Sequence, residues 1–251
     1  MKKAFLKYKI TLFYIPVCLF LFNFLSCGLD TFTVIEDPNQ VTHLPTYESQ
    51  YDEKYFVFQT RESDNSTNGK FKGTSIFYKI YSDREKMTSE AGYLNTTGNS
   101  SATDAETLIN RYGIKELKIE GHNDWPLIEE TKSDRKIYIR LSNYQNDPSL
   151  SAQIRVGSTN GTDGDYLGVP IRNFDDLTFD FGRTSSNSEK NKVPVTGTDD
   201  DVSTSTTVTS EGNWYVSLFA VGVGMETTYN VIYSNILYLG SVTIDANAYD
   251  N

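Results

Sequence analysis

The strongest fold signal in the chain is the stretch 214–222, which reads Trp214-Tyr215-Val216-Ser217-Leu218-Phe219-Ala220-Val221-Gly222. Its side chains alternate between two sets, with Trp, Val, Leu and Ala in one and Tyr, Ser, Phe and Val in the other. Successive side chains of a β-strand point to opposite faces of a sheet, so this period of two predicts a strand. A glycine-containing connector leads to a second such run at 233–244, and the two runs together predict an antiparallel hairpin.

Shorter runs of the same type precede this hairpin. Aromatic residues make up 13% of the chain, and tyrosine and phenylalanine suit the pleated surface of a sheet. The runs at 55–60 and 73–81 flank a turn-rich connector and are expected to pair with each other as antiparallel strands. The other predicted strands lie at 31–35, 117–119, 136–141 (with Ile137, Ile139 and Leu141 facing inward), 151–156 and 177–181.

One short helix is predicted near 103–112. Thr103 can cap its first turn together with Glu106, and Gly113 can adopt the left-handed conformation that ends many helices. The expected fold class is therefore mainly β, an antiparallel β-sandwich with one helix at its surface.

The hairpin at 214–244 resembles the last hairpin of fibronectin type III domains and related immunoglobulin-like sandwiches. In those domains an aromatic-rich strand ends in a step similar to Ala220-Val221-Gly222, and the final strand opens with a segment similar to Tyr233-Ser234-Asn235. This resemblance implies an elaborated immunoglobulin-like or fibronectin III-like sandwich over residues 51–251.

The first residues of the chain have the pattern of an export signal. Lys2 and Lys3 precede an apolar run from Ile10 to Leu25, and the first acidic residue is Asp30. A basic start, a short apolar stretch and then a small residue are typical of secretory signal peptides. A membrane span needs about 20 apolar residues, more than this run offers. We therefore expect residues 1–26 to form a helical signal peptide.

The end of the apolar run, Phe24-Leu25-Ser26-Cys27-Gly28, resembles the lipobox of bacterial lipoproteins. The resemblance implies signal-peptidase cleavage between Ser26 and Cys27 and attachment of lipid, including palmitate, to the Cys27 sulfur. Phe24 departs from the leucine that the family prefers, as in the looser lipobox of spirochaetal lipoproteins. Cys18 is the competing site, but Val17 is a poor fit where a small residue is wanted, so Cys18 is interpreted as an apolar filler.

The stretch from Cys27 to Asp30, followed by a β-rich body without cysteine, is similar to uncharacterised lipoproteins of spirochaetes such as treponemes. We expect a signal peptide at 1–26, then a tether with a first edge strand at 27–50. The sandwich domain at 51–251 is expected to carry a mobile polar excursion at 183–213. The expected location is the bacterial envelope, on the outer membrane or cell surface in preference to the inner membrane.

The charge of the chain limits its partners. The formal net charge is −10, and removal of residues 1–26, which carry four lysines and no acid, would bring it to −14. Such a protein repels phosphates, so no nucleic acid partner is expected. The expected partners are the membrane, through the lipid anchor, and an unidentified protein or glycan.

No catalytic residue, metal ligand or cofactor is assigned from the sequence. The two histidines, His43 and His122, are interpreted as loop residues. The loop from Asn160 to Asp165 offers closely spaced oxygen atoms, as calcium sites do, but turns favour these residues for conformational reasons alone. The run Asp199-Asp200-Asp201 carries charge without an evident geometry.

Carbohydrate binding by exposed aromatic side chains is the chemistry that the sequence leaves open. Trp125 is the main candidate, since most tyrosines alternate at strand spacing and are expected in the core. The leading hypothesis is a non-enzymatic binding or structural module of the envelope. The alternatives are a glycan-acting enzyme that uses paired carboxylates and an adhesin for host matrix.

Overall fold

The structure is a computed structural model that describes residues 34–98, 102–144, 147–183, 189–205 and 212–246, without the side chains of 102–104. The predicted signal peptide, Ser26 and Cys27 lie outside these residues. The chain from Val34 onward forms one compact unit. Strands account for 35% of the residues and helices for 16%, which confirms the prediction of a mainly β protein.

The first of the two large sheets is built around the predicted hairpin. Its strand order is β12-β11-β3-β4. The long antiparallel pair β11 (Asn213–Met225) and β12 (Val231–Asp245) confirms the hairpin, and β11 also pairs with β3 (Phe71–Tyr81). Leu218 and Ala220 face the second sheet while Phe219 and Val221 face the helices, so both faces of β11 are buried.

The outer edge of β3 is covered by three short segments instead of one strand. β6 (Ile128–Glu129) pairs with Gly73 and Thr74, and β4 (Lys115–Glu116) pairs with Phe77 and Tyr78. Val202 adds an isolated parallel bridge to Ile80. On the opposite side of this sheet, the outer edge of β12 donates backbone hydrogen bonds, from Ser241 N to Pro45 O and from Ile236 N to Gly98 O.

The second sheet has the order β1-β2-β7-β8-β9 and is antiparallel throughout. It faces the first sheet across the main hydrophobic core, where Phe56 and Phe58 belong to the same cluster as Ile76 and Val216. Ile137, Ile139 and Leu141 are buried as predicted. The two sheets therefore form a sandwich-like arrangement. The strands are β1 (Asn39–Gln40), β2 (Phe56–Gln59), β7 (Lys136–Arg140), β8 (Gln153–Val156) and β9 (Asp165–Gly168).

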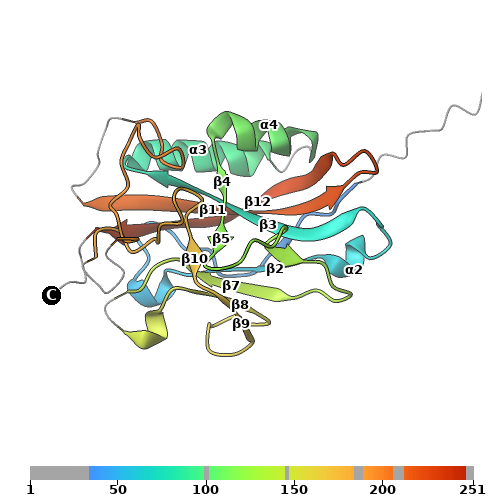
Figure 1. Cartoon of the computed structure of the whole chain (residues 1–251), viewed down its shortest axis with the longest axis horizontal. Coiled ribbons are helices and arrows are strands. Elements are labelled where there is room, and N and C mark those ends of the chain that lie inside the picture. Colours follow the sequence, from blue (N-terminus) through green and yellow to red (C-terminus); the bar gives the residue numbers. More distant parts are fainter. Residues whose placement is uncertain (1–33, 99–101, 145–146, 184–188, 206–211, 247–251) are drawn as a thin grey trace, which may run out of the picture. The chain divides into compact units, whose positions relative to one another are not determined.

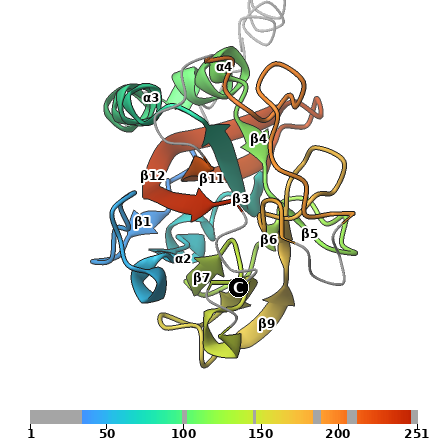
Figure 2. The ribbon, with the colours of Figure 1, turned by 90° about the vertical axis from the view of Figure 1, so that its left-hand side faces the viewer.

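Two helices, α3 (Arg84–Thr97) and α4 (Ala102–Tyr112), cover the other face of the first sheet, which makes a third layer (Figures 1 and 2). The helix predicted near 103–112 is confirmed as α4, and Gly113 has the expected positive φ of 58°. Because α4 begins at Ala102, Thr103 lies inside its first turn.

The prediction of one helix was wrong, because α3 is a second one. The Asp83 side chain caps α3 by accepting hydrogen bonds from Glu85 N and Lys86 N. Its apolar face is thin, with Met87, Ala91 and Leu94 as its buried residues, so the sequence carries little helical periodicity.

The predicted pairing of 55–60 with 73–81 was also wrong, since β2 and β3 lie in different sheets. The connector between them holds the short helix α2 (Glu62–Asn65), which is fixed by an ion pair of Glu62 with Arg135 and by hydrogen bonds between Asn65 and Glu36. The connector therefore crosses between the sheets instead of turning back on itself.

Two other predicted strands are corrected. Residues 177–181 form only an isolated bridge at Thr178, although Phe179 and Phe181 fill the core as their alternation suggested. Val34 and Ile35, the described part of the predicted strand at 31–35, are not in a strand; the first strand instead pairs Asn39 with Gln59. Ile35 is buried, so this residue packs against the β-rich body although it lies within the tether predicted at 27–50.

The segment 183–213 was expected to be a mobile excursion. Most of its described residues, those at 189–205, pack on the body: Val202 pairs with Ile80, and Asp199 and Asp201 are buried. For these residues the expectation of an excursion is corrected, because buried ion pairs hold the segment in place.

Candidate functional site

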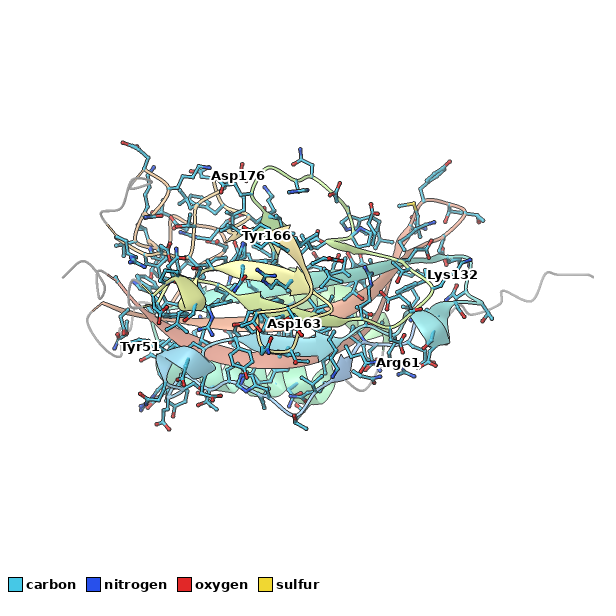
Figure 3. All side chains as sticks on the ribbon, turned by 90° about the horizontal axis from the view of Figure 1, so that it is seen from below. Tyr51, Arg61, Lys132, Asp163, Tyr166 and Asp176 are labelled. Carbon is cyan, nitrogen blue, oxygen red and sulfur yellow. The ribbon has the colours of Figure 1, made fainter. Side chains whose placement is uncertain are left out.

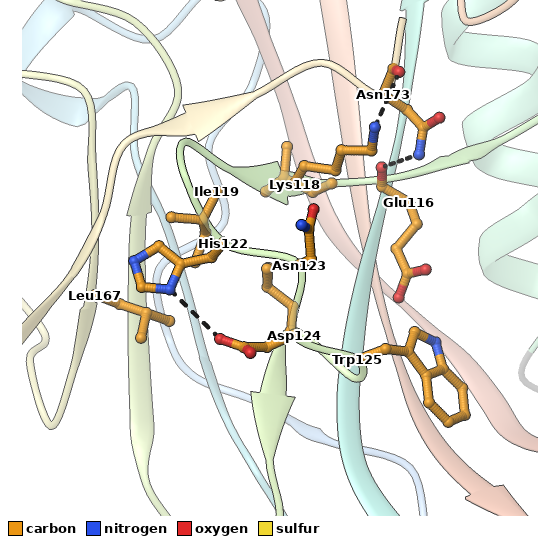
Figure 4. A pocket seen from close by; sticks show the side chains of 11 residues that line it. Glu116, Lys118, Ile119, His122, Asn123, Asp124, Trp125, Leu167 and Asn173 are labelled. Atoms are coloured by element: carbon orange, nitrogen blue, oxygen red, sulfur yellow. Dashed lines mark hydrogen bonds and ion pairs between the residues drawn. The ribbon is translucent and has the colours of Figure 1, made fainter. Parts of the chain in front are cut away.

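A cleft of about 180 Å³ lies beside the outer edge of β3 (Figure 4). It is formed by β4, β5 (Lys118–Ile119), the turn at 120–127, β9 and Asn173. Asn173 follows β10 (Pro170–Ile171), the strand that pairs with β5. The polar and aromatic wall of the cleft comprises Glu116, Lys118, His122, Asn123, Asp124, Trp125 and Asn173.

Trp125 is held at the cleft by its backbone while its side chain stays partly accessible. Its relative exposure is 37%, high for a large aromatic residue. It precedes buried Pro126 through a cis peptide bond, and Pro126 packs on Gly73 of β3. A Cβ at Gly73 would lie 2.8 Å from the Pro126 ring and 2.1 Å from Ile128 O. Only glycine allows β6 to approach β3 so closely, and this approach positions the indole.

The opposite wall depends on a second close approach. Gly168 of β9 has a φ of 155°, and a Cβ there would lie 2.2 Å from the Ile119 side chain. The turn at 120–127 is tied down by Glu120 N, which donates to Val169 O at 3.0 Å, and by His122 N, which donates to Ile119 O at 3.1 Å. The cleft is therefore fixed by main-chain contacts on both sides.

Asn173 is anchored beneath the cleft. Its backbone N–H donates to the Tyr78 hydroxyl at 2.7 Å, and its side-chain amide donates to Glu116 O at 3.3 Å. Lys118 Nζ donates to Asn173 O at 3.4 Å and pairs with Asp176 at 3.1 Å. These contacts join the 173–176 turn to β4 and β5.

The anchor of Asn173 ends in a buried ionic network. The Tyr78 hydroxyl donates to Asp201 at 2.5 Å. Arg172, which is fully buried, donates to both Asp201 oxygens at 2.6 and 2.9 Å and to Asp199 at 2.7 Å. Burial opposes the charge of Arg172, but its hydrogen bonds to Asp201 and Asp199 outweigh this and raise its pKa. Burial, with Asp201 adding to it, raises the pKa of Tyr78. Arg172 therefore keeps its charge and Tyr78 keeps its proton, and their contacts fix the floor of the cleft.

Glu116 is the unusual acid of the cleft. Burial raises its pKa, and a hydrogen bond from the Ser75 hydroxyl opposes this only in part. Glu116 therefore keeps its proton to a higher pH than a free glutamate. Asp124 is exposed and faces His122, with 3.4 Å between the carboxylate and the imidazole Nδ1 (Figure 4).

The cleft combines apolar side chains, among them the flat indole of Trp125, with hydrogen-bonding groups. Amides and carboxyl groups both accept hydrogen bonds, and the amides also donate them. The cleft is smaller than the roughly 300–1,000 Å³ of sites that enclose a drug-sized ligand. It therefore suits the terminal unit of a longer polar ligand better than a small molecule that must be fully enclosed.

The other residues considered in the sequence analysis have structural partners. His43 stacks on Tyr55 with ring centroids 3.8 Å apart, and its Nε2 lies 2.9 Å from Tyr55 O. In the loop at 160–165, which lies by β9 (Figure 3), Asn160 accepts hydrogen bonds from Thr162, and Asp163 accepts one from Ser158. Within the described ranges, no group of three or more His, Cys, Asp or Glu residues is placed to hold a metal ion.

Sequence reasoning missed the residues that support the cleft. Arg172 follows the short strand β10, and its partners Asp199 and Asp201 are far along the chain. An arginine directly after an apolar stretch and a run of three aspartates were both visible. Nothing in the sequence indicates that this arginine and these aspartates form ion pairs.

Comparison with known proteins gives no match, whether to protein-family models, to curated proteins or to solved structures. In the part of the chain that the structure describes, no helix has the length and apolar character needed to cross a bilayer.

Proposed function

We propose that the protein is a lipid-anchored, non-enzymatic binding module of a bacterial envelope, and that it binds the end of a neutral saccharide in the Trp125 cleft. The observation that carries this proposal is a partly exposed indole that lines the same cleft as Asn123, Asn173 and two carboxyl groups. The C–H face of a sugar ring packs on an aromatic ring, and its hydroxyl groups need such donors and acceptors. The net charge of −10 disfavours anionic polysaccharides.

Tryptophan fluorescence provides the test, because the chain has only two tryptophans. Trp214 packs against Phe181, so a Trp214→Phe variant reports on Trp125 alone. We expect a saturable change with N-acetylglucosamine oligomers and none with heparin fragments. Calorimetry should show affinity falling about tenfold or more in Trp125→Ala.

The matched control is Tyr229→Ala, which removes an aromatic side chain that is 83% exposed on the β11–β12 turn. It should leave saccharide affinity unchanged. Equal loss in both variants, or no binding of any neutral glycan by the wild-type protein, would refute the saccharide site.

The lipid anchor is the part of the proposal that rests on sequence. The basic and apolar residues of 1–26 and the lipobox resemblance at Ser26 and Cys27 support it. We expect Cys27→Ser to abolish incorporation of labelled palmitate and to move the protein into the aqueous phase of a detergent partition. Protease shaving of intact cells should remove the body if the anchor lies on the cell surface. Acylation that persists in Cys27→Ser would contradict the assignment.

The finer fold assignment, an immunoglobulin-like or fibronectin III-like sandwich, also remains our proposal. The strand order β1-β2-β7 in one sheet and β3-β11-β12 in the other supports it, since such domains place strands A, B and E opposite C, F and G. In this assignment β8 and β9 extend the first group, and α3 and α4 are additions.

A glycan-acting enzyme is the second candidate, and Glu116 is the observation that favours it. A general acid needs a raised pKa, as burial provides here, and Asp124 lines the same cleft. Asp124 is turned toward His122, which favours binding over catalysis. If the protein is an enzyme, Glu116→Gln and Asp124→Asn should each abolish glycan turnover while binding persists. Absence of turnover in the wild-type protein would eliminate this candidate.

A further inference from the structure

A second and larger cavity, of about 600 Å³, lies on the helix side of the first sheet. Its walls are α3, the C-terminal end of α4, β3 and the loop at 197–204. This volume falls within the range of small-molecule sites. None of its lining residues belongs to the Trp125 cleft.

Lys79 is the buried charge of this cavity. On β3 it lies between Phe77 and Tyr81 on the face turned to the helices, and its relative exposure is 6%. Its ammonium donates to Gly113 O at 3.0 Å. Gly113 leaves space for it, since a Cβ at that position would lie 3.3 Å from Nζ.

The ammonium of Lys79 is incompletely satisfied. A lysine ammonium carries three N–H donors, and one hydrogen bond, to Gly113, is found for it within the described part of the chain. Burial lowers the pKa of Lys79, although Glu90 and Asp201 act in the opposite direction. A buried charge is costly unless it is paired and hydrogen-bonded, so an anion in the cavity would relieve this cost.

The acids of the cavity wall are already paired. Asp199 binds Arg172 at 2.7 Å and Asp200 binds Lys115 at 2.6 Å, and both of these cations lie outside the lining. Glu90 lies 3.7 Å from Lys86 on the next turn of α3.

Two cations of the lining, Lys79 and Arg111, form no ion pair within 4.0 Å among the described residues, although Glu90 and Asp201 act on Lys79 from farther away. Arg111 is exposed at the end of α4, where its guanidinium lies 5.9 Å from the Tyr112 ring centre. The lining as a whole is balanced, with Lys86, Lys79 and Arg111 against Glu90, Asp199 and Asp200. Because those acids are engaged by other cations, Lys79 and Arg111 are the two charges left to meet an anion.

We propose that this cavity binds a small anionic organic molecule, whose phosphate or carboxylate group contacts the Lys79 ammonium while Arg111 holds the entrance. Lysine acts as a point charge toward either group, and the planar guanidinium of arginine can bind either one with two hydrogen bonds. The Tyr112 ring and Asn110 leave room and contacts for the remainder of the ligand.

Amide NMR titrations of the isotope-labelled protein test the site, with inorganic phosphate and acetate as separate probes at constant ionic strength. We expect saturable shifts at Lys79, Arg111 and Gly113 with at least one of the two anions. The anion that binds more tightly identifies the ligand group. Lys79→Met and Arg111→Gln should each weaken binding about tenfold or more.

The matched control is Lys132→Met, which removes an exposed ammonium on the loop between β6 and β7 (Figure 3). Lys79→Arg keeps the charge and should retain part of the affinity. Thermal unfolding of each variant separates loss of the site from loss of the fold. The proposal is overturned if neither anion gives saturable shifts, or if a folded Lys79→Met protein binds as the wild type does.

Discussion

The two edges of β3 differ in how they are covered. Along its inner edge β3 pairs with β11 at ten successive positions from Tyr215 to Gly224, interrupted by one shift in register. Along its outer edge β6, β4 and Val202 each cover one or two residues. The inner edge is one regular ladder, and the outer edge is assembled from segments that are distant in sequence.

This difference separates stability from binding. The inner edge places apolar side chains on both faces of β11 and contributes to both hydrophobic clusters. Both candidate cavities border the outer edge, because the short segments that cover it bring in polar groups such as Glu116, Asp199 and Asp201. Regular pairing builds the core here, and irregular pairing builds the sites.

The largest effect is expected at the outer edge, from Asp201→Ala. This change leaves Arg172 fully buried without its main partner and removes the acceptor of the Tyr78 hydroxyl. Breaking a buried ion pair costs about 3–5 kcal/mol of unfolding free energy. Because Tyr78 anchors Asn173, saccharide affinity should fall as well. Urea denaturation and calorimetry measure the two effects, and a stable variant with unchanged affinity would show that the network does not support the cleft.

A slightly smaller loss of stability is expected at the inner edge, from Leu218→Ala. Leu218 is fully buried between the sheets, and truncating such a leucine costs about 2–5 kcal/mol. In contrast to Asp201→Ala, the folded Leu218→Ala variant should bind saccharide and anion with the affinity of the wild type. Reduced affinity at temperatures where the variant is fully folded would weaken the separation of core from sites.

The pH dependence of stability should sharpen the comparison further. Burial raises the pKa of Glu116 above its ordinary value of 4.5. The folded protein then binds more protons than the unfolded chain, so Glu116 makes the wild type less stable as the pH rises from 4.5 through the folded pKa. Glu116→Gln should remove this dependence. Denaturation curves of the two proteins are compared across this range, and parallel curves would argue against a buried acid.

The smallest effect is expected from Lys115→Gln. Its ion pair with Asp200 is partly exposed, and such pairs contribute less than about 1 kcal/mol. The change leaves Asp200 unpaired on the wall of the Lys79 cavity, so it should weaken anion binding by a small factor. The NMR titration measures this, and a gain in anion affinity would contradict the proposed charge balance.

The difference between regular and irregular pairing also separates what the sequence could predict from what it could not. The β11–β12 hairpin and α4 were predicted because their patterns are local and regular. The partners of β3 were not, since its outer edge is covered by pairs of residues that carry no periodicity. Trp125 was visible as a candidate, but nothing in the sequence pointed to Asn173, which a hydrogen bond to the Tyr78 hydroxyl holds in the same cleft. Neither Lys79 nor Glu116 differs in sequence from an ordinary solvent-facing strand residue.

The covered edges of the first sheet have a consequence for how copies of the protein behave together. An uncovered strand edge is a template on which a second chain can add a strand, and aggregation often begins there. Here β4, β6 and Val202 occupy parts of one edge, while Pro45 and Gly98 accept hydrogen bonds from the other. If the proposed anchor concentrates many copies on one membrane, these contacts would keep neighbouring molecules from joining sheet to sheet.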